Sequence, residues 1–240
     1  MSPRLPSLRP VVLPALWALL VVAACSDSGG SSGGGGGAAD TTSTFVGILS
    51  SDDASESGAI SVTISTANPA PPVPTGVAFA VVTAAGSMSV VGGGSISLSG
   101  TYDDASKLLS LSGGGYSFAG AYDGTNRLEG TYTGPSTQGT FVSAQSNGSA
   151  TAYCGSYGGD DQGLWNFVID GSKVLGQAVS SLSGTNLPLD GSISGGTITI
   201  KFPGTQQTLA SGSKSGTSVS GNWADPNSSD HGTWSGTVCP

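Results

Sequence analysis

The stretch LEGTYTGPSTQGTF, residues 128–141, decides the fold class, because apolar or aromatic residues alternate with small or polar ones on both sides of a turn. Alternation with a period of two is typical of a β-strand that has one face in a core. Gly134 and Pro135 lie between the two runs and favour a turn. The stretch is therefore predicted to form a β-hairpin.

A similar stretch, VSGNWADPNSSDHGTW, occupies residues 219–234. Its glycine, aromatic and proline positions match those of residues 128–141, with two residues inserted in the turn. Each stretch closes one half of the chain. We therefore predict a tandem duplication, with one β-meander repeat over residues 44–146 and a second over residues 151–240.

Further alternating runs recur along both halves, separated by turn residues at the short intervals that a sandwich or barrel requires. In the first half they include separate runs at residues 77–83 and 87–91, after a proline-rich loop at residues 68–74. The predicted fold class is all-β, an antiparallel meander that forms two tandem barrel-like units. One barrel or sandwich shared by both halves is the alternative.

The composition by itself favours disorder, because Gly accounts for 40 of 240 residues and charged residues for only 9%. A disordered chain has no physical reason to keep apolar residues at alternate positions, so the alternation favours a folded body. One pattern, apolar-x-Gly-x-aromatic, occurs at residues 98–102, 118–122, 128–132 and 219–223. Its three named positions share one strand face, where glycine leaves space for a neighbouring ring and lets the strand bend.

Residues 1–24 have the features of a secretion signal. Arg4 and Arg9 precede an apolar run from Val11 to Ala24, which is shorter than the roughly 20 residues that a permanent membrane span needs. Residues 25–43, which include five consecutive glycines, are predicted to be a flexible Gly/Ser-rich tether.

The signal ends in Val22-Ala23-Ala24-Cys25, which resembles the lipobox of bacterial lipoproteins. The resemblance implies that Cys25 receives a diacylglyceryl thioether, that the chain is cleaved before it, and that the new amino terminus is acylated, which anchors the protein in a membrane. The second mature residue is Ser26 rather than Asp, which implies the outer membrane if the bacterium has two. An ordinary signal-peptidase site with an unmodified cysteine is the alternative.

The mature chain is acidic. Loss of the two arginines leaves 7 − 2 = 5 basic residues against 15 acidic ones, a net charge of −10. A nucleic-acid partner is therefore not expected.

Cys154 and Cys239 are the two cysteines that remain after lipidation of Cys25. An even pair in an exported protein is expected to form a disulfide. The two residues lie on the first and last predicted strands of the second repeat, which become neighbours when an even-stranded meander closes. Free thiols or a metal-binding pair are the alternatives.

The aromatic residues have two possible roles. They either fill the barrels or line a cavity for a small apolar molecule or a sugar, and Trp165, Trp223 and Trp234 are the candidate ligand-binding residues. His231, beside Asp230, is expected to be a turn residue, and the doublet Asp160–Asp161 is expected to face solvent. The sequence indicates no catalytic group, metal site or cofactor, so an enzyme is not predicted.

The glycine–aromatic meander resembles avidin-like and lipocalin-like barrels, which implies an architecture and no particular residue roles. The favoured function is a non-enzymatic interaction or scaffold module of the cell envelope, which predicts filled barrels. The alternative is a barrel that binds a small ligand, which predicts an open mouth lined by the candidate tryptophans with a polar group pointing inward.

Overall fold

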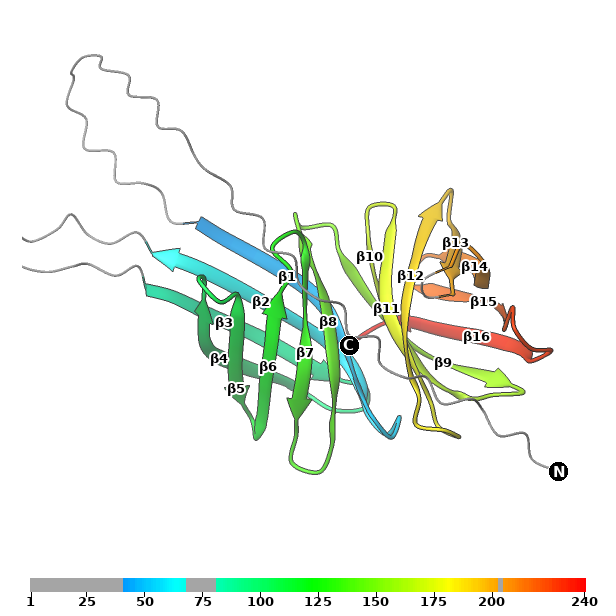
Figure 1. Cartoon of the computed structure of the whole chain (residues 1–240), viewed down its shortest axis with the longest axis horizontal. Coiled ribbons are helices and arrows are strands. Elements are labelled where there is room, and N and C mark those ends of the chain that lie inside the picture. Colours follow the sequence, from blue (N-terminus) through cyan, green and yellow to red (C-terminus); the bar gives the residue numbers. More distant parts are fainter. Residues whose placement is uncertain (1–40, 68–80, 203–204) are drawn as a thin grey trace, which may run out of the picture. The chain divides into compact units, whose positions relative to one another are not determined.

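The computed structural model describes residues 41–67, 81–202 and 205–240. These residues form two closed barrels, one after the other along the chain, each made of eight antiparallel strands. Figure 1 shows the first barrel in blue to green and the second in green to red. The prediction of an all-β fold with two tandem barrels is confirmed.

Consecutive strands are hydrogen-bonded neighbours throughout both barrels. The strands of the first barrel are β1 (Thr41–Ser51), β2 (Ser57–Ala67), β3 (Val81–Val90), β4 (Ser95–Asp103), β5 (Leu108–Gly113), β6 (Tyr116–Tyr122), β7 (Arg127–Thr133) and β8 (Gln138–Ser146). Those of the second are β9 (Thr151–Gly159), β10 (Gly163–Asp170), β11 (Lys173–Ser180), β12 (Asn186–Ser194), β13 (Thr197–Lys201), β14 (Thr208–Ser215), β15 (Ser218–Ala224) and β16 (His231–Val238).

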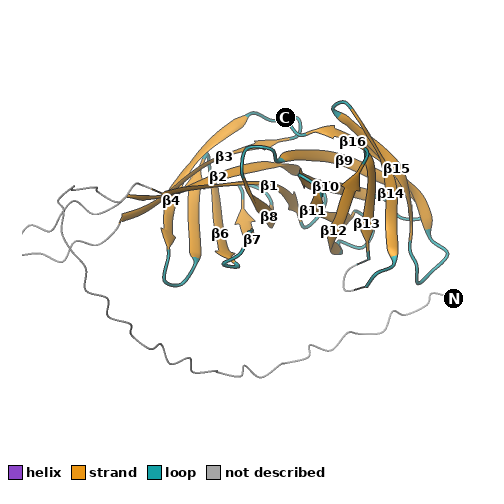
Figure 2. Cartoon of the chain, turned by 90° about the horizontal axis from the view of Figure 1, so that it is seen from above, coloured by secondary structure: helices purple, strands orange, loops and turns teal. Residues whose placement is uncertain are grey.

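Each barrel closes in the same way, because its first strand pairs with its last: β1 with β8, and β9 with β16. Figure 2 shows only strands and loops in the described part of the chain. Within those residues there is no helix long and apolar enough to cross a membrane.

The two predicted runs at residues 77–83 and 87–91 are wrong as separate strands, because β3 is continuous from Val81 to Val90. The small residues in its middle suggest a turn, but Gly86 stays paired with Val62 and Leu98 on its two neighbours. A Cβ at Gly86 would lie 2.5 Å from the carbonyl oxygen of Ser61, so glycine here permits a close approach of strands. Residues 77–80 and the predicted loop at 68–74 lie outside the described residues.

Two predicted boundaries also differ. Strand β1 begins at Thr41, so the last three residues of the predicted tether belong to the first barrel, whereas the rest of the tether lies outside the described residues. The alternation predicts a short strand at residues 191–194, but strand β12 begins five residues earlier, at Asn186, and includes Pro188, whose exposed side chain faces away from the core. Proline cannot donate a ladder hydrogen bond, so it is uncommon inside a strand.

The two hairpins that suggested the duplication have the same register. Phe141 on β8 pairs with Gly130 on β7, and Trp234 on β16 pairs with Gly221 on β15. The residues that the sequence comparison matched therefore occupy equivalent positions in the seventh and eighth strands of each barrel.

Glycines on the inner faces leave room for aromatic rings. A Cβ at Gly120 would lie 2.6 Å from Cζ of Phe141, and a Cβ at Gly212 would lie 2.4 Å from Cζ2 of Trp234. Both distances are too short for a real contact. The predicted role of the pattern glycine, to make space for a neighbouring ring, is therefore seen at Gly120. Gly212, which lies outside the predicted pattern, has the same role.

The first barrel has a packed interior. Buried apolar side chains from all eight of its strands form one cluster, with aromatic rings in contact near its centre. Phe118 stacks on Tyr132 with ring centroids 5.5 Å apart and meets Phe141 edge to face at the same distance. Packing of this kind is what keeps a small eight-stranded barrel closed.

A disulfide joins Cys154 on β9 to Cys239, the residue after β16. The predicted disulfide is thus present, at the seam where the second barrel closes. Cys154 lies between Tyr153 and Gly155, which face inward, so the bond is on the outer side of the barrel wall. There it belongs to a small buried cluster with Ile48 and Val142 of the first barrel.

Polar contacts join the same two outer faces, and both barrels belong to one compact unit. Asn166 on β10 is completely buried and donates from Nδ2 to the carbonyl oxygen of Leu49 at 2.6 Å and to Oγ of Ser50 at 2.7 Å. Nearby, Nε2 of Gln177 donates to the carbonyl oxygen of Thr140 at 3.1 Å. A buried amide needs such partners to offset its loss of water.

Candidate ligand-binding cavity

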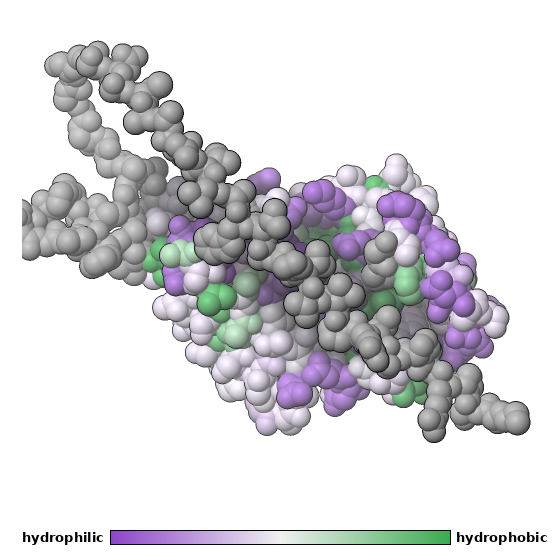
Figure 3. Space-filling view, in the orientation of Figure 1, coloured by the Kyte–Doolittle hydropathy of each residue, from purple (hydrophilic) through white to green (hydrophobic). Residues whose placement is uncertain are grey.

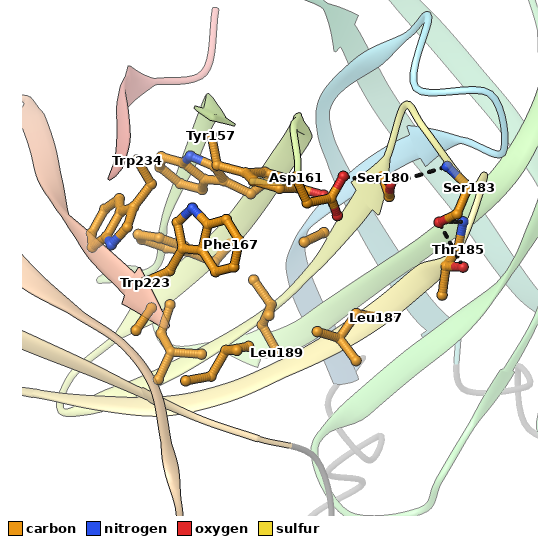
Figure 4. Close-up of a pocket in the computed structure, with 15 residues that line it drawn as sticks. Tyr157, Asp161, Phe167, Ser180, Ser183, Thr185, Leu187, Leu189, Trp223 and Trp234 are labelled. Carbon is orange, nitrogen blue, oxygen red and sulfur yellow. Dashed lines mark hydrogen bonds between the residues drawn. The ribbon is translucent and has the colours of Figure 1, made fainter. Parts of the chain in front are cut away.

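The second barrel contains a cavity of about 290 Å³. Alternation along β10 directs Trp165 and Phe167 inward and leaves Asn166 on the outer face. Trp223 of β15 and Trp234 of β16 line the same space. Figure 4 shows Phe167, Trp223 and Trp234 gathered at one end of the cavity, and Trp165 also lines it.

The aromatic end is an ordered cluster. Trp165 stacks on Phe167 with ring centroids 4.5 Å apart, and Trp234 meets Trp165 edge to face at 5.3 Å. Tyr157 on β9 makes an edge-to-face contact with Trp223 at 5.9 Å. Such arrangements hold aromatic rings in place more firmly than apolar burial alone.

The indole N–H groups of the three tryptophans donate hydrogen bonds to backbone carbonyl oxygens of the barrel wall. Nε1 of Trp165 donates to the carbonyl oxygen of Ser156 at 3.0 Å, and Nε1 of Trp223 donates to that of Gly158 at 3.2 Å. Nε1 of Trp234 donates to the carbonyl oxygen of Asn222 at 3.2 Å. The three tryptophans therefore offer a ligand their ring surfaces and not their hydrogen-bond donors.

Aliphatic side chains complete the wall. They come from β11 to β14, and they are Ala178, Leu187, Leu189, Ile200, Leu209 and Ala210. In Figure 4, Leu187 and Leu189 lie across the cavity from the aromatic rings. A concave, mostly apolar space with a few polar groups is the usual form of a small-molecule site.

The polar groups are gathered at the rim, around Asp161 in the turn between β9 and β10. Its Oδ2 accepts a hydrogen bond from the hydroxyl of Tyr157 at 3.1 Å. Its Oδ1 accepts one from Oγ of Ser180 at 2.9 Å and one from the backbone N–H of Gln162 at 2.7 Å. The half-buried carboxylate is therefore held in one position by three donors.

The same network orders the loop between β11 and β12. Oγ of Ser180 accepts hydrogen bonds from the backbone N–H groups of Leu182 and Ser183, both at 3.2 Å, and Oγ of Ser183 donates to Oγ1 of Thr185 at 2.9 Å. Figure 4 shows this chain of contacts running along the rim away from the aromatic end.

Tyr157 is kept in its neutral form by its surroundings. Burial raises the pKa of its hydroxyl, and the neighbouring charge of Asp161 together with their hydrogen bond raises it further. A neutral phenol that donates to a carboxylate is stable in such a site, because ionisation would place two negative charges side by side.

The three candidate tryptophans of the sequence are thus brought together at one cavity. The prediction that side chains fill both barrels agrees with the packed first barrel but is wrong for the second. Sequence reasoning also missed Asp161, which was expected to face solvent as part of a turn doublet. Its four-residue separation from Tyr157 carries no recognisable signal, because their contact depends on how the β9–β10 turn folds back over the barrel end.

The possible catalytic groups do not converge. His231 lies at the start of β16 with its side chain 75% exposed, and Nδ1 is 3.1 Å from Oδ2 of Asp160 rather than beside the carboxylate of Asp230. Among the described residues, no group of three His, Cys, Asp or Glu side chains is placed to hold a metal ion.

The visible outer surface carries only small apolar patches among polar residues (Figure 3). The large apolar side chains that are exposed lie in separate places along the sequence, at Val91, Leu108, Leu182 and Val238. Exposed apolar residues of this kind are normal on a protein surface.

Comparison with known proteins finds no match to any family model and no similar curated protein. The fold and the cavity therefore define the class: a tandem double β-barrel with one packed barrel and one that contains an aromatic cavity.

Proposed function

We propose that the protein binds a small, mainly apolar molecule in the cavity of its second barrel. The observation that carries the proposal is the aromatic cavity of about 290 Å³, with its polar groups confined to one rim. A barrel with a purely structural role would be expected to have a filled interior, as the first barrel does. For the second barrel, the cavity therefore favours the ligand-binding alternative over an interaction or scaffold module.

The scaffold role remains our proposal for the packed first barrel. Among the described residues, its interior is filled by one apolar cluster, and its wall bonds to the second barrel through the carbonyl oxygen of Leu49 and the hydroxyl of Ser50. We propose that it supports the binding barrel and separates it from the tether.

We further propose that the protein is an exported lipoprotein, attached to a membrane of the cell envelope through lipid on Cys25. The lipobox-like Val22-Ala23-Ala24-Cys25 supports this, and so does the disulfide between Cys154 and Cys239, since disulfides persist in oxidising compartments. In a bacterium with two membranes, Ser26 favours the outer one.

Tryptophan fluorescence tests the binding proposal directly. Of the four tryptophans, one lies in the signal, and the other three, Trp165, Trp223 and Trp234, all line the cavity. Titration of the mature protein with 4-phenylbutan-1-ol, a neutral probe with an apolar body, should give a saturable change in emission. Native mass spectrometry of the purified protein should also reveal any small molecule retained from the host.

A pair of variants locates the binding. Ala178→Phe places a ring in the cavity and should abolish the saturable change, whereas Ala224→Phe adds the same ring at an exposed position on β15 and should leave it intact. Equal responses from the two variants, or no saturable response from the wild type, would contradict the proposal.

The intact mass of protein extracted from membranes tests the anchor. Processing at Cys25 predicts a chain that begins at residue 25 and carries the mass of a diacylglyceryl group and an additional acyl chain. Cys25→Ser should remove the lipid mass and release the protein from the membrane fraction. An unmodified Cys25 in a lipoprotein-competent host would overturn this part of the proposal.

A further inference from the structure

Among the described residues, no oppositely charged side chain pairs with the carboxylate of Asp161. The three groups that donate to its carboxylate, the hydroxyls of Tyr157 and Ser180 and the backbone N–H of Gln162, are all neutral. The ion pairs found among the described residues involve other carboxylates, those of Asp104 and Glu129, and the one histidine contacts Asp160. A half-buried carboxylate without a counter-ion is a favourable place for a ligand's positive charge.

The rest of the wall also favours a cation. Among the described residues that line the cavity, none is Lys, Arg or His, so an anionic ligand would find no opposite charge. The faces of Trp and Tyr rings are electron-rich and attract cations, most strongly where water is excluded. Because the indole N–H groups are already bonded to backbone carbonyls, the ring surfaces are what a ligand meets.

The first barrel has a related arrangement whose space is already occupied. Glu56 lies in the turn between β1 and β2, equivalent to the turn that carries Asp161, and accepts a hydrogen bond from the hydroxyl of Tyr116 at 2.8 Å. The Tyr116 ring lies 6.2 Å from the ring of Tyr132, which is the counterpart of Trp223. In both barrels a carboxylate from the first hairpin thus lies near aromatic rings. Among the described residues, Tyr132 belongs to the packed apolar cluster of the first barrel and Tyr116 packs against it, whereas Asp161 lines the cavity of the second.

From these observations we infer that the ligand of the second barrel is an organic cation, in which an ammonium group on a compact apolar body pairs with Asp161 while the body lies against the tryptophans. The inference rests on the proposed function and adds the charge of the ligand to it. It also assigns the two ends of the site, with the ammonium at the rim and the apolar body inside.

A purely structural role for Asp161 makes a different prediction. If the carboxylate only ties the β9–β10 turn to the β11–β12 loop through Ser180, then the charge of a ligand should not affect its affinity. Removing the carboxylate would in that case change the binding of neutral and cationic ligands by the same factor. The comparison must therefore vary ligand charge at constant size.

Three probes with the same apolar body provide that comparison: 4-phenylbutylamine, 4-phenylbutan-1-ol and 4-phenylbutyrate, titrated into the full mature protein at pH 7. The amine should bind roughly tenfold more tightly than the alcohol, as one ion pair with cation–π support would give, and the carboxylate should bind most weakly. In Asp161→Asn the affinity for the amine should fall to that of the alcohol, with the alcohol's own affinity unchanged. Asp160→Asn, the same change at the adjacent residue that pairs with His231, should behave as wild type.

The outcomes distinguish failure of the cationic-ligand inference from failure of the proposed binding function. If the wild type binds the alcohol and the amine equally, the ammonium inference is overturned and the binding function stands. If none of the three probes binds at millimolar concentration, both are overturned. Because the wild-type comparison needs no variant, it decides the matter even if Asp161→Asn folds poorly, and loss of the amine's advantage at high salt would support the ion pair independently.

Discussion

Cys239 lies one residue beyond β16 and is bonded to Cys154 on β9, with their Cα atoms 5.0 Å apart and a separation of 85 positions in the sequence. The bond therefore fastens the two strands that close the second barrel. Because β9 is also the first strand of that barrel, the covalent link spans nearly the whole repeat.

Removal of this disulfide should destabilise the protein strongly. For a closed loop of this length, the chain-entropy treatment gives a loss of about 4–5 kcal/mol in unfolding free energy. Urea unfolding, followed by tryptophan emission, measures this loss of unfolding free energy when the Cys154→Ala/Cys239→Ala double variant is compared with the wild type. Cys25→Ser removes a cysteine outside the bond and should leave the midpoint unchanged. A double variant as stable as the wild type would show that strand pairing alone holds the seam.

The buried amide of Asn166 should contribute to the stability of the pair of barrels. Asn166→Ala leaves the carbonyl oxygen of Leu49 and the hydroxyl of Ser50 without this donor, which should cost about 1–3 kcal/mol. Asn222→Ala, a matched change at an exposed strand position, should cost much less. Equal midpoints for the two variants in thermal unfolding would mean that water replaces the lost contacts.

Gly155 should be intolerant of a side chain where Gly158, on the same strand, is not. A Cβ at Gly155 would lie 2.3 Å from Cζ2 of Trp165, whereas a Cβ at Gly158 would have no atom within 4 Å. Gly155→Ala should therefore lower the unfolding free energy by about 1–3 kcal/mol and shift the tryptophan emission, while Gly158→Ala should do neither. The prediction fails if the two variants have the same emission spectrum and stability.

The protein should lose stability above pH 10. Burial raises the pKa values of Tyr157, Tyr132 and Tyr116, the last to about 12. Below pH 10 these tyrosines are protonated in both the folded and the unfolded state, so their contribution to the free energy of unfolding is fully present. Above pH 10 they ionise first in the unfolded chain, and this contribution is lost as the pH rises toward the folded-state pKa values.

Tyr157→Phe tests how much of this loss of stability above pH 10 comes from Tyr157. The variant should lose less stability than the wild type between pH 10 and 11.5 in denaturant titrations, because it has one fewer tyrosine with a raised pKa. Between pH 7 and 9 the two proteins should have the same pH dependence. Parallel curves above pH 10 would show that Tyr157 ionises equally easily in both states.

Local patterns were sufficient to predict most of the fold. Alternation and turn residues gave the positions of most strands, and the match between the hairpins that end in Phe141 and Trp234 gave the division into two repeats. The errors occurred where local signals conflict with pairing. Gly86 lies inside β3 although its small neighbours suggest a turn, and Pro188 lies inside β12 because its exposed side chain and missing donor can be accommodated there.

The sequence by itself determined the all-β class and the two repeats, because period-two alternation depends on chain order alone. It also indicated a disulfide between Cys154 and Cys239 and the three tryptophans as candidates for a cavity. Only the tertiary structure decided which barrel is filled and which is hollow. That difference depends on how side chains from eight strands share one interior volume, and no single strand contains that information. Tertiary structure also placed Asp161 beside Tyr157 and Ser180, since only the closing of the barrel brings these residues together at the rim.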